Sequence, residues 1–378
     1  MKIYNIHKLI VVFFISTLFL TSCNNDNNDV PVAENTFDGN GLKVLTYAYH
    51  EKGVSGKGLS VTTIAEFDTQ DTYNNYADDL DNQMDALDDA FVAKWGYLND
   101  DALNAKEEEL GFDSEKPLTD FENQIGVQSL RQKYIAAENA WLDNDILDEA
   151  KDPDNSSIYD FDESKMALIN KLGEVKIGIT IVKKLTVKQI NDINITLAKS
   201  GVKGKSALID ATDGAYLTIN DGDFNTLIAY NEGDVSVVNN DNVTVKSGAP
   251  AIDCQYNKKK VQTFNLSTTR KIKTKIKVGQ PTFGTGNVKA KIVSYKKRNS
   301  RGWKKYRTTL TVGLVGDVSD GNCSGYTEHI DKTRTKRRKR LKKKYHNPNF
   351  QISHVVENGG MKGVYSQNGV TRQLVLTW

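Results

Sequence analysis

Acidic and basic residues are segregated along this chain of 378 residues. Residues 24–165 contain 33 Asp and Glu against 10 Lys and Arg, whereas residues 251–378 contain 6 acidic against 29 basic residues. Residues 166–250 contain 9 of each kind. The net charge of +2 therefore conceals one segment of −23 and one of +23. Such asymmetry indicates modules with separate partners, or modules that dock on one another within one molecule.

The composition is that of a globular protein. Hydrophobic residues make up 38% and charged residues 26% of the chain, with six prolines. These values exclude wholesale disorder, a collagen-like repeat and a polytopic membrane protein, and the length suits roughly two domains.

Residues 1–22 are expected to be a lipoprotein signal peptide. Lys2 and Lys8 precede an apolar stretch over residues 9–20, which is too short to span a bilayer. Residues 20–23 (LTSC) resemble the bacterial lipobox. The resemblance implies cleavage before Cys23 and lipidation of that cysteine, and several acyl chains make a stable membrane anchor.

Residues 23–40 are predicted to be a lipid-anchored flexible tether, because they are polar and lack apolar periodicity. The Asn and Asp residues that follow Cys23 resemble those of Bacteroidota lipoproteins. That resemblance implies an outer-membrane location, facing either the periplasm or the cell surface.

Two cysteines remain once Cys23 carries lipid. Cys254 and Cys323 form an even pair in an oxidising compartment, which favours a disulfide bond. The alternative is a catalytic thiol near His329, but no nucleophile signature surrounds either cysteine.

Residues 41–172 are predicted to be an acidic helical region opened by a strand pair, over residues 42–49 and 59–67. A long helix follows, because seven apolar residues spaced three or four apart share one face. They are Tyr73, Tyr76, Leu80, Met84, Leu87, Phe91 and Trp95. Capping boxes at Thr119-x-x-Glu122 and Ser129-x-x-Gln132 predict two further helices, which Gly126 separates. A short helix is expected at 164–172.

Residues 173–250 are predicted to be a mixed connecting region that opens with a strand at 174–185. The chain from 251 to 378 is predicted to be a basic β domain. Lys271, Lys273, Lys275 and Lys277 alternate with apolar residues, which places four ammonium groups on one outer face of a strand. Turns near 283–287 and 298–302 indicate antiparallel strands. The expected fold class is α+β, with a helical part followed by an antiparallel β-sandwich or jelly-roll-like domain.

Three runs in the middle of the chain have the style of Bacteroidota lipoproteins of unknown function. They are FENQIGVQSLRQKY, DPDNSSIYDFDESKMALINKLGEVKIG and SYKKRNSRGWKKYR. The resemblance covers roughly residues 59–323. It implies a two-part fold and an envelope location, and it assigns no catalytic residues.

Residues 332–344 contain ten basic residues in thirteen. They are either a solvated mobile loop that balances the acidic half, or a polyanion site that binds by point charges and counterion release. Residues expected to bind a polyanion are Lys271, Lys273, Lys275, Lys277, Lys336, Arg337, Arg338, Lys339, Arg340, Lys342, Lys343 and Lys344. The expected partners are the membrane and an anionic polysaccharide or lipopolysaccharide, rather than nucleic acid. Tyr295, Trp303, Tyr306 and Tyr345 suit either sugar stacking or cross-strand packing.

Motifs for catalysis and metal binding are weak. No zinc signature, phosphate loop or nucleophile elbow occurs, so no catalytic residue, metal or cofactor is expected. Asp221, Asp223, Asn225 and Glu232 have EF-hand spacing, but Thr226 replaces the glycine that such a loop needs, which favours a turn. The favoured function is a non-enzymatic interaction lipoprotein. A glycan-processing or other hydrolase and a self-assembling surface protein remain alternatives.

Overall fold

The computed structural model describes residues 33–36, 41–51, 58–200, 215–247, 258–279, 287–299, 301–320, 327–347, 352–355 and 360–376. Helices dominate between residues 70 and 142, and strands dominate from residue 258 onward, so the α+β fold class is confirmed. Cys23, Cys254 and Cys323 lie outside the described residues, as does the expected signal peptide. In the described part of the chain, no helix has the length and apolar character needed to cross a membrane.

A seven-stranded sheet, here called the N-terminal sheet, unites the opening strand pair with the region from 173 to 250. Its strands, which lie side by side in chain order, are β1 (Ala33–Thr36), β2 (Leu42–His50), β3 (Leu59–Phe67), β4 (Glu174–Ile177), β5 (Thr180–Leu185), β6 (Ala215–Ile219) and β7 (Val243–Ser247). Strands β3 and β4 are parallel, and the other neighbours are antiparallel. The expected boundary between regions at residue 172 therefore divides a single sheet, because β4 to β7 extend the sheet that β2 and β3 begin.

Two local predictions for this sheet need correction. The single strand expected at 174–185 is a hairpin, because Gly178 adopts a φ of 57° between β4 and β5. The end of the expected tether is not free, because β1 pairs with β2. The predicted opening strand pair is confirmed as β2 and β3.

The long helix predicted from the apolar stripe is confirmed as α1 (Gln70–Trp95). Tyr73, Leu80, Met84 and Phe91 of the stripe are buried. The other helices and 3₁₀ turns are α2 (Asp100–Glu109), α3 (Lys116–Ile125), α4 (Leu130–Leu142), η1 (Glu149–Lys151), η2 (Pro153–Asn155), α5 (Glu163–Ala167), α6 (Val187–Ser200), α7 (Phe224–Asn231) and η3 (Val235–Asn239).

The N-cap of one of the two predicted capping boxes is confirmed. The Ser129 side chain accepts a hydrogen bond from the backbone N–H of Gln132, at 3.1 Å, and begins α4. Thr119 lies inside α3, which begins three residues earlier and carries Pro117 in its first turn, a position that proline favours. Gly126 ends α3 in the left-handed region, with a φ of 66°. Helix α5 is shorter than the helix expected at 164–172.

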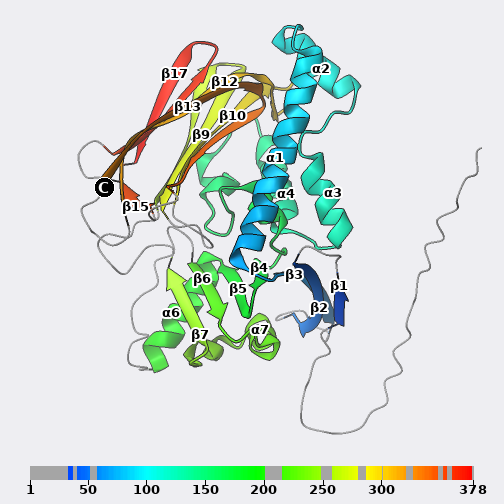
Figure 1. Cartoon of the computed structure of the whole chain (residues 1–378), viewed down its shortest axis with the longest axis vertical. Helices are drawn as coiled ribbons and strands as arrows, with labels where there is room; N and C mark the ends of the chain where they lie inside the picture. The colour runs from blue at the N-terminus through cyan, green and yellow to red at the C-terminus, as the bar shows by residue number, and fades with distance from the viewer. Residues whose placement is uncertain are drawn as a thin grey trace, which may run out of the picture.

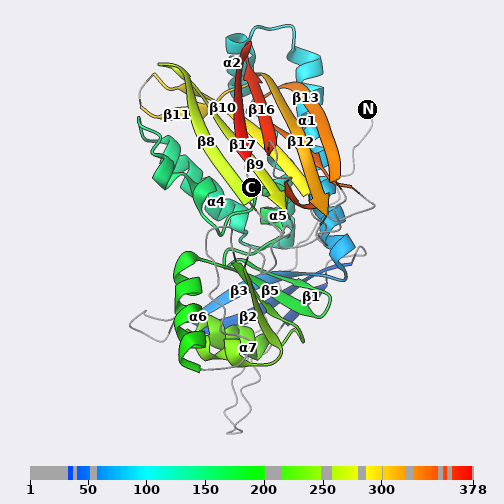
Figure 2. The same ribbon diagram turned by 90° about the vertical axis from the view of Figure 1, so that its left-hand side faces the viewer.

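Helices cover both faces of the N-terminal sheet (Figures 1 and 2). On one face, Val44, Ala65 and Phe67 form an apolar core with residues of α1, α3 and α4. On the other face, Leu45, Ile64 and strand β6 form a second core with α6, α7 and η3. The N-terminal sheet is thus the middle of three layers.

The basic part of the chain is a β-sandwich, as predicted. The inner sheet, which faces the helices, contains β8 (Lys258–Ser267), β9 (Arg270–Gly279), β10 (Asn287–Lys297), β11 (Trp303–Lys305) and β14 (Arg340–Tyr345). The outer sheet contains β12 (Thr308–Asp320), β13 (Thr327–Arg338), β15 (Ile352–Val355), β16 (Met361–Gln367) and β17 (Val370–Leu376). Side chains such as Ile276, Ile292, Leu314 and Tyr365 form one core between them.

The chain passes between the two sandwich sheets twice at one edge. It leaves β11 and enters β12 through Tyr306 and Arg307, and it leaves β13 and enters β14 through Lys339. Helices α1 and α4 lie along the inner sheet on the side away from the sandwich core (Figure 1). The interpretation of 332–344 as a mobile loop is wrong, because these residues form most of β13 and β14.

Replacing Ser129 by Ala is expected to lower the free energy of unfolding by about 1–2 kcal/mol, because the helix N-cap is lost. The Ser129 hydroxyl also donates a hydrogen bond to the Glu122 carboxylate, at 2.5 Å. The matched control Thr119→Ala should change stability by less than about 0.5 kcal/mol. Urea denaturation of both variants measures this difference, and equal losses would contradict the assignment of the cap.

Candidate functional site

Basic side chains occupy the face of the inner sheet that points away from the sandwich core. Ile272, Ile276 and Val278 of β9 point into the sandwich core, as predicted, so the alternating lysines lie on the opposite face. That face is not solvent-exposed. Lys273 is 1% and Lys275 is 2% exposed, because the helical layer covers them.

The strand register aligns these cations into rows across the sheet. The first row contains Lys259, Lys277, Lys289 and Lys344, on β8, β9, β10 and β14. The second row contains Lys275, Lys291 and Lys342, and the third contains Lys273 and Arg340 with Val293 between them. We call these nine residues the cation grid. Like charges directly opposite one another destabilise a sheet, so the grid requires anions above it.

Residues 152–163, here called the acidic segment, supply many of these anions. Asp152 caps the 3₁₀ turn η2 by accepting a hydrogen bond from the backbone N–H of Asp154, at 2.9 Å. Pro153 occupies the first position of that turn. In this tight turn both carboxylates reach the grid. The Lys273 ammonium lies 2.7 Å from Asp154 and 3.1 Å from Asp152, and the Lys275 ammonium lies 2.8 Å from Asp154.

The end of the acidic segment pairs with the next strands. Glu163 lies 2.7 Å from Lys291, and Asp162 pairs with Lys289 and lies 3.0 Å from Lys342. Phe161 comes between the two groups of carboxylates. The Lys275 ammonium lies over its ring, and the Lys275 Nζ is 4.9 Å from the ring centroid. Cation–π contact of this kind adds to the attraction when both groups are desolvated.

The interface holds its key carboxyl groups ionised. Burial opposes ionisation of Asp154, but the ammonium groups of Lys273 and Lys275 outweigh burial and keep the Asp154 pKa well below its usual range. Lys289 and Lys342 have the same effect on the pKa of Asp162. Burial and the neighbouring Asp154 raise the pKa of Asp152. The arrangement therefore keeps Asp154 and Asp162 ionised at neutral pH, whereas Asp152 ionises less readily.

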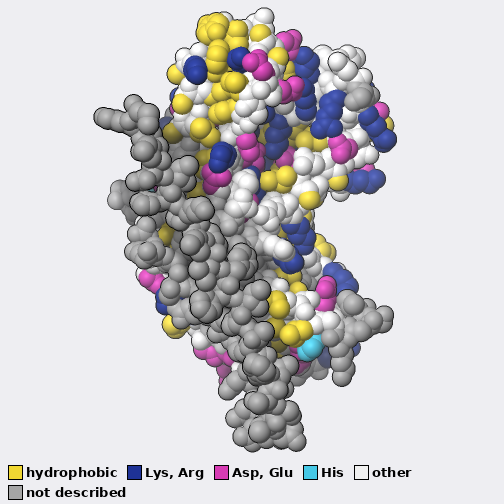
Figure 3. Space-filling view, turned by 90° about the vertical axis from the view of Figure 1, so that its right-hand side faces the viewer, with side chains coloured by type: hydrophobic (Ala, Val, Ile, Leu, Met, Phe, Trp, Pro, Cys, Tyr) yellow, Lys and Arg dark blue, Asp and Glu magenta, His cyan; other side chains and the backbone are white. Residues whose placement is uncertain are grey.

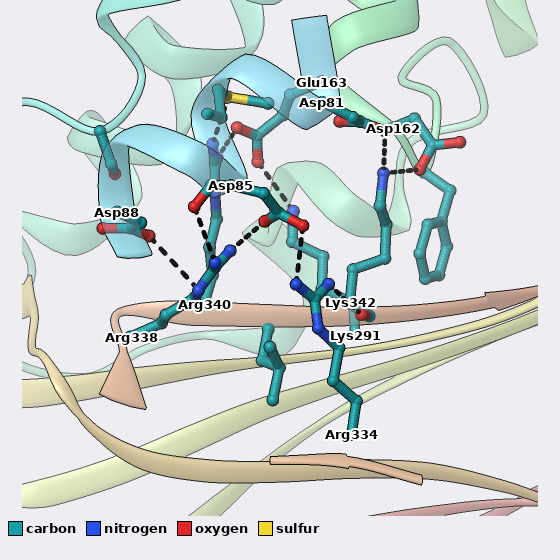
Figure 4. Close-up of a pocket in the computed structure, with 14 residues that line it drawn as sticks. Asp81, Asp85, Asp88, Asp162, Glu163, Lys291, Arg334, Arg338, Arg340 and Lys342 are labelled. Carbon is teal, nitrogen blue, oxygen red and sulfur yellow. Dashed lines mark hydrogen bonds and ion pairs between the residues drawn. The ribbon is translucent and has the colours of Figure 1, made fainter. Parts of the chain in front are cut away.

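Helix α1 supplies a second row of carboxylates, which faces β13 and β14. Asp81, Asp85, Asp88 and Asp89 are three or four residues apart or adjacent, so they share one side of the helix. Asp85 pairs with Arg338 and lies 2.7 Å from Arg334. Figure 4 shows the carboxylates of α1 and the acidic segment pointing toward cations that project from the sheet. They enclose a cavity of about 70 Å³.

Arg307 is the most deeply buried cation of the molecule as described, with no exposed surface. Its guanidinium lies 2.6 Å from Asp88 and 3.1 Å from Glu107. Its backbone N–H donates to the Asn104 side chain, at 2.7 Å, at the point where the chain passes between sandwich sheets. This residue fastens α1 and α2 to the edge of the sandwich.

An apolar contact completes the interface. Trp141, Leu142 and Leu147 of α4 and the following loop pack on Val293, Tyr295 and Trp303 of the inner sheet. Tyr295, Trp303 and Tyr306 are at most 2% exposed, so their ring faces serve packing rather than sugar stacking.

The predicted polyanion-binding residues are therefore largely engaged within the molecule. Those that pair with carboxylates of the helical part are Lys273, Lys275, Lys336, Arg337, Arg338, Lys339, Arg340, Lys342 and Lys344. For Lys273, Lys275 and Arg338 the predicted outward, solvent-facing position is wrong, because they are buried. Lys271, Lys277 and Lys343 have no carboxylate partner among the described residues. Figure 3 shows acidic and basic side chains interspersed on one side of the molecule, which fits internal pairing.

The EF-hand-like spacing is used for turn and capping contacts. Asp223 caps α7 by accepting hydrogen bonds from two backbone N–H groups, and Asp221 accepts from Asn242, at 2.6 Å. Glu232 accepts from the backbone N–H of His50, at 2.8 Å. Within the described ranges, no three His, Cys, Asp or Glu side chains gather as a metal site.

Comparison with known proteins gives no relative. No family model, no curated protein and no solved structure matches this chain. The candidate function therefore rests on the charged residues of the interface and of the remaining surface.

Replacing Asp154 by Asn should lower the free energy of unfolding by about 3–5 kcal/mol, because two buried ammonium groups lose their shared carboxylate. Asp148→Asn, at an exposed ion pair, is the control and should cost less than about 0.5 kcal/mol. Adding Lys273→Met to the Asp154→Asn variant should recover part of the loss. Urea denaturation of the unsubstituted protein, of Asp154→Asn, of Lys273→Met and of the double variant forms the test, beside the Asp148→Asn control. Additive losses in the double variant would contradict direct coupling.

Stability is expected to rise between pH 7 and about pH 9.5. Burial and neighbouring lysines lower the pKa of Lys259 to about 7 and of Lys277 to about 8. An unfolded lysine has a pKa near about 10.4, so the unfolded chain binds more protons throughout this window and the free energy of unfolding increases with pH. Toward acid, stability is lost as carboxyl groups with lowered pKa values, such as Asp154, become protonated.

Urea denaturation at a series of pH values measures this profile. The Lys277→Met variant should show a shallower rise above pH 7 than the unsubstituted protein. A free energy of unfolding that falls between pH 7 and pH 9.5 would contradict the assignment of two lysines with lowered pKa values.

Proposed function

We propose that this chain is a lipid-anchored, non-enzymatic interaction protein of the bacterial outer membrane, and that its sandwich contacts an anionic polymer or surface. The lipobox resemblance at Cys23 supports the anchor. The interaction class is supported by the use of the charged residues, because many cations of the basic half pair with carboxylates of the acidic half and a smaller number stay free.

The observation that carries the proposal is one group of these free cations, here called the basic patch: Lys271, Lys297 and Arg301. Lys271 is the second residue of β9 and lies beside the end of β10, where the backbone N–H of Lys297 donates to the carbonyl of Thr269, at 3.0 Å. Lys297 and Arg301 are exposed and Lys271 is partly exposed. In the part of the chain that the structure describes, none of the three forms an ion pair with a carboxylate.

The basic patch has uncompensated positive charge. Burial is the main cause that lowers the pKa of Lys271, and the nearby Lys297 ammonium lowers it further. The Lys271 ammonium lies over the Trp303 ring, 4.5 Å from its centroid, so the side chain is held in place. Near an anionic lipid surface, each such residue contributes about 1 kcal/mol of attraction.

The geometry favours this function over the two alternatives. A glycan hydrolase needs an acid with a raised pKa beside an open cleft. Asp154, Asp162 and Glu115 are instead held ionised by buried cations. Asp152 has a raised pKa, but it is 4% exposed and lies 3.1 Å from Lys273 rather than in an open cleft. Self-assembly through opposite charged faces is disfavoured because those faces already pair within one chain.

The test measures retention of the chain from Asn24 onward on heparin and on lipopolysaccharide vesicles across a salt gradient. The variant Lys271→Gln, Lys297→Gln, Arg301→Gln should elute at lower salt. The dependence of log affinity on log salt should become shallower by about 2 to 3, since each lost cation no longer releases a counterion.

The matched control variant neutralises Lys332, Lys362 and Arg372, which belong to the outer sheet. It loses the same amount of positive charge as the first variant. It should elute close to the unsubstituted protein. Equal shifts in both variants, or no retention of the unsubstituted protein at low salt, would overturn the proposal.

A further inference from the structure

A groove runs between α1 and α3, which lie side by side in the helical part (Figure 1). Phe112, just before α3, stacks on Phe91 with 4.1 Å between ring centroids, and Phe121 of α3 lies 6.1 Å from Tyr76. The two helices are therefore antiparallel. The groove between them has a volume of about 600 Å³, within the range of about 300–1,000 Å³ that is typical of binding sites.

The groove has a mainly apolar lining. Leu80 and Phe121 line it and are 4% and 8% exposed, because they also belong to the core between the helices and the N-terminal sheet. Tyr76, Leu87 and Pro117 line it as well and are partly exposed. The core thus holds the floor of the groove in place, while the remaining apolar side chains are accessible to a partner.

The charged residues of the groove give it a net negative charge. Two of its described lining residues are acidic, Asp79 and Asp120, and one is basic, Lys116. Lys116 already pairs with Asp120, at 2.5 Å. The exposed Asp79 carboxylate accepts a hydrogen bond from the Gln83 side chain, at 2.7 Å, and forms no ion pair with the described residues. Asp79 therefore offers negative charge that no cation of the described chain neutralises.

Asp79 differs in this respect from the aspartates on the sandwich side of α1. Five of those pair with cations of the sandwich: Asp78, Asp81, Asp85, Asp88 and Asp89. Asp79 lies instead on the side of the helix that lines the groove. The internal pairing that consumes the other carboxylates thus leaves this one for a partner.

Charge decides between the possible occupants of the groove. A second copy of this chain in a two-fold contact would bring a second Asp79 to the same interface, and like charges would face each other. An anionic membrane surface would be repelled. A purely apolar molecule would leave the carboxylate without a cation. A partner that combines an apolar face with a positive charge fits both features.

We propose that this groove binds an amphipathic helix of a partner protein that carries lysine or arginine beside its apolar face. Tyr76 and Leu87 are eleven residues apart on α1, or about 16 Å along the helix axis. Apolar side chains at positions i, i+4 and i+7 of a partner helix span about 10 Å, so they fit within the groove. The apolar contacts supply most of the affinity, and Asp79 selects a basic partner.

The site is independent of the basic patch. It lies in the helical part, has the opposite charge and binds a protein segment rather than an anionic polymer. Loss of one activity therefore leaves the other unchanged.

The test measures binding of a fluorescein-labelled helical peptide of leucine, alanine and lysine to the chain from Asn24 onward, by fluorescence anisotropy. Its leucines have the spacing i, i+4, i+7, and the matched peptide has glutamate in place of lysine. The lysine peptide should bind about tenfold more tightly at low salt, and added salt should reduce this preference. Equal binding of both peptides, or no saturable binding of the lysine peptide, would overturn the proposal.

The decisive variant is Asp79→Lys. It should bind the lysine peptide about fivefold more weakly than the unsubstituted protein does, because attraction becomes repulsion. The matched control is Asp241→Lys, which makes the same charge change at an exposed carboxylate before β7 and should leave binding unaltered. An Asp79→Lys protein with an unchanged preference for the lysine peptide would contradict the assignment.

A second variant tests the apolar contact. Leu87→Ser should weaken binding of both peptides by at least about fivefold, because Leu87 loses its apolar side chain. In the unsubstituted protein, the methyl ¹³C signals of Leu80 and Leu87 must shift when the lysine peptide is added. Unshifted signals would place the peptide elsewhere and overturn the proposal.

Two controls identify other occupants. Sedimentation of the chain without peptide detects a dimer, and a dimer that Leu87→Ser dissociates would show that a second copy fills the groove. Flotation with phosphatidylcholine vesicles detects lipid binding, and binding that Leu87→Ser abolishes would show that lipid fills it. Either result would overturn the assignment of a basic helix.

Discussion

The packing of the helical part on the sandwich depends on the ion pairs between Asp154 and the ammonium groups of Lys273 and Lys275. Removing two ammonium groups and a carboxylate from water costs several kcal/mol per ion, and only close, mutual pairing offsets that cost. The inner sheet alone would expose rows of repelling lysines, and the acidic segment alone would expose clustered carboxylates. Each half therefore requires the other, and the extreme charge segregation along the chain follows from this mutual requirement.

Charge pairing sets how the helical part lies on the sandwich, while apolar contacts bury much of the surface between them. Trp141 and Leu142 pack on Val293 and Trp303 at one end of the interface. Along α1, aspartates at helical spacing meet arginines at strand spacing, so that Asp85 and Asp89 both pair with Arg338. The fully buried Arg307 then fastens the edge where the chain passes between the sandwich sheets. The resulting three-layer helical part and sandwich form a single body.

Periodicity in the sequence predicted much of the fold. The stripe from Tyr73 to Trp95 predicted α1, and the alternation from Lys271 to Val278 predicted both β9 and the side of it that faces the core. What covers the other side could not be predicted, because alternation says which side chains share a face and not what packs on it. Docking of the acidic half on the basic half was one of two outcomes that the charge distribution allowed.

Other features depend on tertiary contacts that leave little local signal. Thr119 and Ser129 both begin apparent capping boxes, but the helix that contains Thr119 already begins at Lys116, with Pro117 in its first turn. The hairpin of β4 and β5 needs Gly178 at a positive φ, and one glycine within a β-rich run is weak evidence for a turn. In the sequence, the acidic segment gave no sign of its own of what it would pair with. Its pairing with β9 joins residues more than a hundred positions apart.

Hydrogen exchange of the backbone amides tests the central claim most directly, namely that buried ion pairs make the helical part and the sandwich one cooperative unit. The account predicts that the slowest amides of α1 and α4 and those of β9 and β10 open with the same free energy, and that Asp154→Asn lowers both together. Opening of α1 and α4 at a much lower free energy than β9 and β10, unchanged by Asp154→Asn, would contradict it.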